Sequence, residues 1–118
     1  MLKVVIPQFD FGYNEQFTVY TDGRHLNVKD LTGFEAWLFA WSDEKSEEPY
    51  IGRQIDVADD PTSGIVYWNL IEEDTYQYGN YKAEIRFYHA GEYSNVLYTT
   101  MQFNLQITPA WQGLYGEG

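Results

Sequence analysis

The chain has no cysteine among its 118 residues. No disulfide can form, so the fold has to rest on its hydrophobic core alone. Basic residues are also scarce, because 7 Lys and Arg stand against 18 Asp and Glu, which gives a formal net charge of −11. This charge disfavours phosphate backbones and anionic membranes as ligands. We therefore expect no nucleic-acid partner and no membrane partner.

Long apolar runs are missing as well. The first seven residues, Met-Leu-Lys-Val-Val-Ile-Pro, hold too short an apolar stretch for a signal peptide and lack a small-residue cleavage site. No later run is long enough to span a membrane as a helix. These absences predict a soluble protein that is cytoplasmic when made, with incorporation into a larger particle as a later step.

Helical periodicity is absent beyond one or two turns, whereas strand-like runs recur between Gly, Pro, Asp and Asn. This pattern predicts an all-β protein, an immunoglobulin-like antiparallel β-sandwich of about seven strands within residues 1–108. Residues 109–118 lose the alternation and gain glycine, which predicts a flexible or partner-ordered C-terminal tail. Strands are expected over Leu2–Ile6, Glu15–Thr21, Phe34–Trp41, Tyr50–Val57, Ile65–Leu70, Asn80–Tyr88 and Val96–Ile107.

Two features of this pattern make finer predictions. The acidic run between Leu70 and Gly79 suits one turn of 3₁₀ or α-helix, since carboxylates favour a helix start and glycine favours its end. Tyr81 then opens the sixth strand, where sandwiches carry a tyrosine whose hydroxyl bonds back to the preceding corner. We expect Tyr81 and Trp68 to be buried.

Aromatic residues make up 19% of the chain, and the segment Phe34–Trp41 concentrates them. Because side chains alternate across a strand, Trp37, Phe39 and Trp41 share one face and the smaller residues share the other. Only one face can pack on the core of a small two-layer domain, so the face with the large rings is expected on the outside, where it indicates a partner surface. The sixth strand adds Arg86 and Tyr88 to this face. We therefore predict the partner-binding residues Trp37, Phe39, Trp41, Arg86 and Tyr88.

Several turn-and-strand motifs follow one another along about residues 10–107. They are Thr21-Asp22-Gly23, Asp30-Leu31-Thr32-Gly33, Ser63-Gly64-Ile65-Val66-Tyr67, Glu73-Asp74-Thr75 and Gly79-Asn80-Tyr81-Lys82-Ala83-Glu84. Their order and spacing resemble those of the immunoglobulin-like N-terminal domain of tailed-phage baseplate upper proteins and related phage structural modules. The resemblance implies a non-catalytic virion or prophage component, whose partners are other virion structural proteins, itself as a homo-oligomer, or both.

Catalytic chemistry has few candidate residues. There is no cysteine, and the two histidines, His25 and His89, lie in contexts that suggest neither a triad nor an acid–base pair. We expect no enzyme, no catalytic residues and no cofactor. The acidic turn at Asp56, Asp59 and Asp60 admits Ca²⁺, but it matches no EF-hand loop, and ordinary turn and cap roles are favoured. No metal site is predicted.

Two other functions fit parts of the sequence. A carbohydrate-binding module uses exposed Trp and Tyr on a β-sandwich to stack on sugar rings. An acidic mimic of DNA uses carboxylates ordered along one face, whereas here they are scattered through turns. Assembly through the aromatic strand remains the main prediction, with these two as alternatives.

Overall fold

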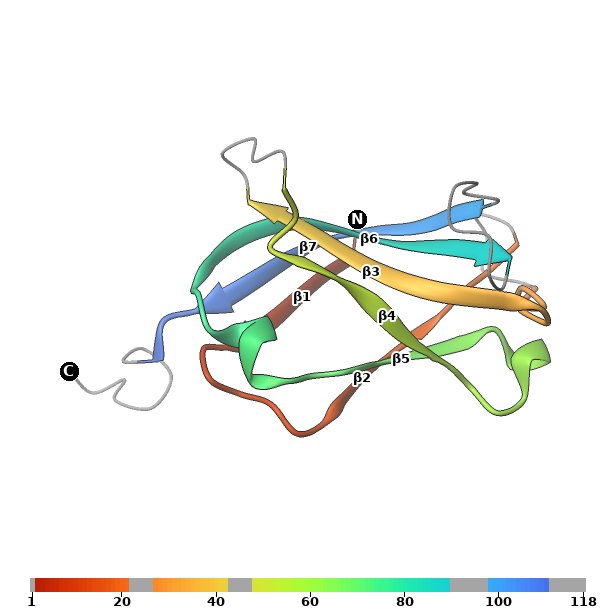
Figure 1. Cartoon of the computed structure of the whole chain (residues 1–118), viewed down its shortest axis with the longest axis horizontal. Helices are drawn as coiled ribbons and strands as arrows, with labels where there is room; N and C mark the ends of the chain where they lie inside the picture. The colour runs from red at the N-terminus through yellow and green to blue at the C-terminus, as the bar shows by residue number, and fades with distance from the viewer. Residues whose placement is uncertain (1, 22–26, 43–47, 90–97, 111–118) are drawn as a thin grey trace.

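The computed structural model describes residues 2–21, 27–42, 48–89 and 98–110 (Figure 1). Most of the described residues lie in strands, which confirms the all-β class. Two short 3₁₀ helices, of one turn each, lie between the strands. The elements are β1 (Leu2–Pro7), β2 (Asn14–Thr18), β3 (Phe34–Ser42), β4 (Ile51–Val57), η1 (Pro61–Ser63), β5 (Ile65–Asn69), η2 (Glu72–Thr75), β6 (Gly79–His89) and β7 (Tyr98–Thr108).

The seven strands form one hydrogen-bonded sheet in the order β1-β7-β6-β3-β4-β5-β2. Strand β4 pairs with β3 along one part and with β5 along another, so the sheet continues through it from the first five strands to the last two. Figure 1 shows the sheet curling around β4 into a half-barrel. All pairs are antiparallel except β1 with β7, which is parallel. The sequence pattern predicted antiparallel strands only.

The core lies on the concave side of the curled sheet. Alternation along each strand sends small and aliphatic side chains inward, as on β3, where Ala36, Leu38 and Ala40 are buried. The rings of Phe17 on β2 and Phe103 on β7 lie 5.1 Å apart, so the core joins strands from opposite ends of the strand order. The largest fully buried side chain is Trp68, which confirms its predicted burial.

The predicted strand positions agree with the structure to within a few residues at each end. The single turn expected after Leu70 is η2. Asp22 and Gly23 of the first motif and the last eight residues of the predicted tail lie outside the described residues.

Tyr81 has the role expected of it. It is buried at the start of β6, and its hydroxyl donates to the carbonyl of Gln77 at 2.9 Å, four residues upstream. Its ring stacks on Tyr50 with centroids 4.8 Å apart. The Tyr50 hydroxyl in turn donates to the Glu73 carbonyl at 2.8 Å and accepts from the Gln77 amide at 3.0 Å. The two tyrosines thereby connect the residue before β4 and the start of β6 to η2 and the residues that follow it.

A buried carboxylate that the sequence pattern did not reveal completes this corner. Asp74 in η2 is 3% exposed and forms an ion pair with Arg53 of β4. Its Oδ2 atom also accepts from the indole N–H of Trp68 at 2.9 Å and from the backbone N–H of Ile71 at 3.0 Å. Because buried polar groups are costly unless they are bonded, Asp74 holds η2 in place against β4 and β5.

Candidate functional site

Three large rings stand in a row on the convex side of β3. Trp37, Phe39 and Trp41 alternate with the buried alanines and leucine, and each is half-buried. The ring centroids of Trp37 and Phe39 are 6.4 Å apart, and those of Phe39 and Trp41 are 5.8 Å apart, with nearly parallel planes in both pairs. We call these three residues the aromatic row.

A glycine of the neighbouring strand lies beside the aromatic row. Gly52 of β4 lies opposite Phe39 in the sheet, and a Cβ added to it would lie 3.5 Å from the Phe39 ring and 3.3 Å from Pro49. Glycine thus leaves open the space between the Phe39 ring and the Pro49 side chain. The sequence analysis did not select Gly52. A glycine within a predicted strand was the available signal, because such glycines mark places where another group approaches closely.

On the opposite side, Arg86 of β6 extends over the aromatic row. Its Cζ atom lies 4.7 Å from the centroid of Phe39 and 5.3 Å from that of Trp41, both within cation–π range. Glu84 accepts from the Arg86 Nε atom at 2.8 Å and so fixes the guanidinium. This bond to Glu84, with a smaller contribution from Tyr88, raises the pKa of Arg86. The group is thus a permanent cation held over aromatic faces.

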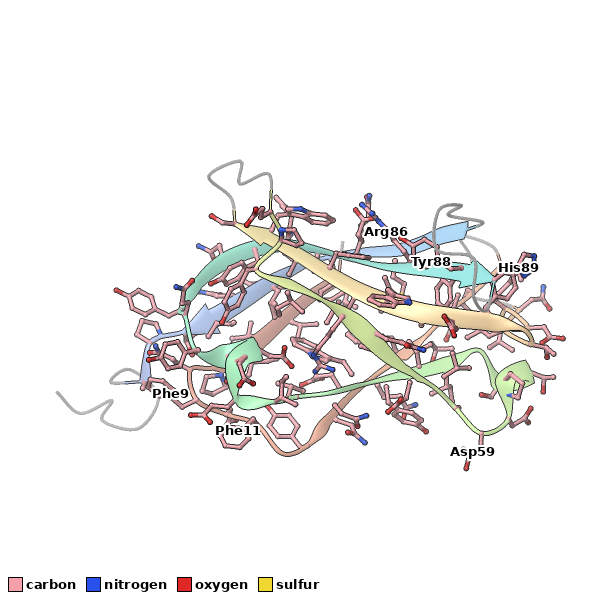
Figure 2. The ribbon with its side chains drawn as sticks, in the orientation of Figure 1. Phe9, Phe11, Asp59, Arg86, Tyr88 and His89 are labelled. Carbon is pink, nitrogen blue, oxygen red and sulfur yellow. The ribbon has the colours of Figure 1, made fainter. Side chains whose placement is uncertain are left out.

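Tyr88 differs from the other predicted site residues. By alternation it belongs to the convex side of β6, opposite Glu35 of β3, but only 6% of it is exposed. Figure 2 labels it close to Arg86. Tyr88 therefore offers little surface to a partner. It was predicted as a binding residue, and its burial beside Arg86 makes it a support for that side chain instead.

The convex side becomes polar beyond Trp41. In the sheet register, Trp41 lies opposite Lys82, Lys82 opposite Asn104 and Asn104 opposite Lys3. The Lys82 Nζ atom donates to Asn104 Oδ1 at 3.1 Å. A hollow of ≈ 250 Å³ lies beside Trp41, where Lys82, Glu84 and Gln102 supply its polar lining. The face thus combines an aromatic row with a strip of amides and ammonium groups.

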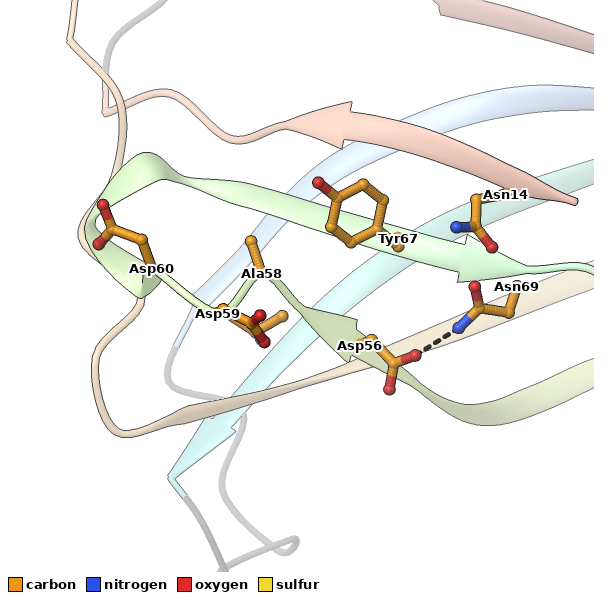
Figure 3. Close-up of a pocket in the computed structure, with 8 residues that line it drawn as sticks. Asn14, Asp56, Ala58, Asp59, Asp60, Tyr67 and Asn69 are labelled. Atoms are coloured by element: carbon orange, nitrogen blue, oxygen red, sulfur yellow. Dashed lines mark hydrogen bonds between the residues drawn. The ribbon is translucent and has the colours of Figure 1, made fainter.

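A larger pocket of ≈ 560 Å³ lies elsewhere, where β2, β4 and β5 meet, and it includes the acidic turn (Figure 3). Asp56 accepts from the side-chain amide of Asn69, and Asp60 caps η1 by accepting from the Thr62 backbone N–H at 3.0 Å. Asp59 follows on the same turn. Asp60 thus has the cap role favoured for it, whereas Asp56 lies within β4 and bonds across to β5. The described residues contain no group of three His, Cys, Asp or Glu side chains placed to hold a metal ion.

Histidine offers no catalytic arrangement in the part of the chain that the structure describes. His89 at the end of β6 stacks on Phe34, with centroids 5.4 Å apart and planes 9° apart. His25 lies outside the described residues. No helix among the described residues has the length and apolar character needed to cross a membrane.

No family model matches the chain, and no curated protein matches it.

Proposed function

We propose that this protein is a non-catalytic binding module that contacts another protein through the convex side of β3. The observation that carries the proposal is the aromatic row, with Arg86 held over it by Glu84. Trp and Arg are the residue types that most often contribute large shares of binding energy at protein interfaces. The three rings lie on the side of β3 opposite the core residues and are not part of the core cluster.

The face is also preorganised. The Glu84–Arg86 pair holds the cation over the Phe39 ring before any partner arrives. Preorganisation lowers the entropy that a binding surface loses when it docks. The partner we propose is another structural protein, a second copy of this chain, or both.

Assignment to a virion or prophage particle is part of the proposal, and it rests on the resemblance in motif order described above. The finer fold assignment, an immunoglobulin-like sandwich whose two sheets join along β4, belongs here too. It is supported by the Tyr81–Gln77 hydrogen bond at the start of β6 and by the ring contact between β2 and β7.

The test replaces Trp37 and Trp41 by Ser together. We expect the double variant to keep its β-rich circular dichroism spectrum while losing oligomer formation or binding to structural proteins encoded beside it, because each interface aromatic carries about 2 kcal/mol of affinity or more. Tyr67→Ser, which removes a half-buried ring on β5 outside this face, is the matched control and should bind as the wild type does.

Two measurements decide the outcome. Light scattering across a range of concentrations gives the molar mass of the wild type and both variants, and co-expression with neighbouring gene products tests other partners. Unfolding of the double variant would place its rings in the core. Unchanged assembly by a folded double variant would reject the face as the interface.

A carbohydrate-binding function is the second candidate, and one observation favours it. The hollow beside Trp41 pairs an indole with Lys82, Glu84 and Gln102, which are groups that bond to sugar hydroxyls. The guanidinium over Phe39 and Trp41 argues against it, because the cation occupies ring surface that a sugar would need. Retarded migration in gels containing polysaccharide, lost in Trp41→Ser, would favour sugar binding over protein assembly.

A further inference from the structure

Two loops at one end of the molecule are bonded into a single surface. They are residues 8–13, between β1 and β2, and residues 70–78, around η2, and we call them the paired loops. Their backbones exchange hydrogen bonds from Phe9 N to Thr75 O at 3.1 Å, from Gly12 N to Leu70 O at 3.0 Å and from Leu70 N to Tyr13 O at 2.9 Å. The side chains of Gln8 and Thr75 add bonds to Tyr76 O at 2.8 Å and Asp10 O at 3.0 Å.

This surface is rich in exposed apolar side chains. Among the described residues nine large hydrophobic side chains are exposed, and six of them lie on the paired loops. Figure 2 shows Phe9 and Phe11 at the end of the molecule opposite His89, well away from Arg86. Contiguous exposed apolar surface on rigid loops marks an interaction site. The six are Phe9, Phe11, Tyr13, Ile71, Tyr76 and Tyr78.

Phe9 has a strained backbone conformation within this surface. Its φ is +71°, the only positive φ of a non-glycine residue among the described positions, and its ring is 48% exposed. A bulky side chain is strained in this left-handed region, where glycine is comfortable. The ring meets the Tyr76 ring edge-on at 6.0 Å, and Tyr76 is itself 60% exposed. An aromatic side chain thus occupies a position whose backbone conformation favours glycine.

The charges around these rings have one sign. Asp10, Glu72 and Glu73 are exposed, and the sequence of the paired loops contains no Lys or Arg. The fourth acid, Asp74, is turned inward and paired with Arg53, so it does not contribute to the surface. Tyr13 donates from its hydroxyl to Asp10 at 3.3 Å, which places one carboxylate directly beside a ring.

We propose that the paired loops form a second interaction surface, and that its partner is a basic protein segment carrying Arg or Lys. Cations of such a segment lie over the exposed rings and pair with the three carboxylates. The same combination already occurs within this molecule, where Arg86 lies over Phe39 and pairs with Glu84. The net charge of −11 adds long-range attraction for a basic partner. This surface is separate from the aromatic row, so the proposal is independent of the function proposed above.

The test pans a library of displayed random peptides on the immobilised full-length protein. We expect the enriched peptides to carry Arg or Lys beside apolar residues. A synthetic copy of one enriched peptide is then titrated by fluorescence anisotropy. Phe9→Gly and Tyr76→Ser each remove one ring without changing charge, and each should weaken binding about tenfold, as expected for an aromatic anchor.

Three controls make the result specific. Glu72→Gln with Glu73→Gln should weaken binding and flatten its dependence on salt, because it removes ion pairs and leaves the rings. Trp41→Ser, on the aromatic row, should bind within about twofold of wild type. Phe9→Gly should unfold at a temperature equal to or above that of the wild type, since glycine relieves the positive φ.

Other outcomes overturn the proposal. Enrichment of peptides without Arg or Lys rejects the basic partner. If Phe9→Gly and Tyr76→Ser bind the basic peptide as tightly as the wild type does, the peptide is attracted by net charge alone and the rings form no site. If the wild type self-associates and Phe9→Gly does not, the surface binds a second copy of this chain instead of a basic partner. If Trp41→Ser fails to bind the peptide, the peptide site is the aromatic row.

Discussion

Replacing Asp74 by Ala removes the acceptor shared by three donors at the corner of the fold. The indole N–H of Trp68, the backbone N–H of Ile71 and the guanidinium of Arg53 all bond to this carboxylate. Trp68 is fully buried, so its N–H has no water to replace the lost acceptor. Arg53 is 28% exposed and keeps its bond to the Asn69 carbonyl, so it is the least affected of the three.

The expected loss of stability follows from these three bonds. A buried donor left without a partner costs about 1–3 kcal/mol, which applies to the Trp68 N–H. Loss of the cap on Ile71 costs about 1 kcal/mol. The Arg53 pair adds about 1 kcal/mol or less, because solvent screens an ion pair with one partly exposed member. The sum, about 2–5 kcal/mol, is a large share of the ~5–15 kcal/mol that stabilises a typical domain.

Asp74→Asn is the matched comparison. An amide oxygen in the place of Oδ2 still accepts from Trp68 and Ile71, while the charge is lost and an NH₂ group faces Arg53. We expect this variant to lose about half as much stability as Asp74→Ala, with the order wild type, Asn, Ala.

Urea denaturation followed by far-ultraviolet circular dichroism gives the free energies of unfolding of the three proteins. Proton exchange of the Trp68 indole N–H, followed by NMR, should quicken in Asp74→Ala and remain slow in Asp74→Asn. The reasoning is refuted if Asp74→Ala stays within about 1 kcal/mol of wild type, the size of an ordinary surface change. It is also refuted if the two variants are equally unstable.

Three further predictions concern Tyr81 and Gly64. Tyr81→Phe should cost about 1 kcal/mol in a urea titration at neutral pH, because it removes the bond to the Gln77 carbonyl. Burial, with a smaller effect of Tyr50, raises the pKa of Tyr81 to about 12, so the folded state holds this proton more tightly than the unfolded chain. The contribution of the Tyr81 hydroxyl to the free energy of unfolding is therefore fully present below about pH 10, the ordinary tyrosine pKa, and is lost as the pH rises toward 12. Over that range Tyr81→Phe should lose less stability than the wild type does. Gly64→Ala should cost about 2 kcal/mol or more by thermal unfolding, because φ is +71° and the new Cβ would lie 2.9 Å from the Val19 carbonyl oxygen; a melting temperature equal to that of wild type would contradict this.

Strand positions and inward faces were predictable because the signals for them are local. Alternation on β3 and β6 depends on residues two apart, and a strand that buries Ala36 and Leu38 must turn Trp37 outward. The Tyr81 bond was predictable for the same reason, since its acceptor lies only four residues away.

The candidate site was predictable only in part. The aromatic row could be placed from its own strand, but the burial of Tyr88 depends on what packs over that end of β6, and the fit of Gly52 to Phe39 depends on the register between β3 and β4. The paired loops were not foreseen, because Phe9 and Tyr76 are far apart in the sequence and each alone resembles an ordinary loop residue.

The amino-acid sequence by itself determined the all-β class, the approximate bounds of the strands and the side of each strand that is buried, since hydrophobic alternation and turn residues act over a few positions. Tertiary structure decided the parallel pairing of β1 with β7 and the continuity of the sheet through β4. It also decided the pairing of Arg53 with the buried Asp74, and the joining of two loops into one aromatic and acidic surface. These features depend on contacts between residues distant along the chain, whose geometry arises only when the sheet curls and the core closes.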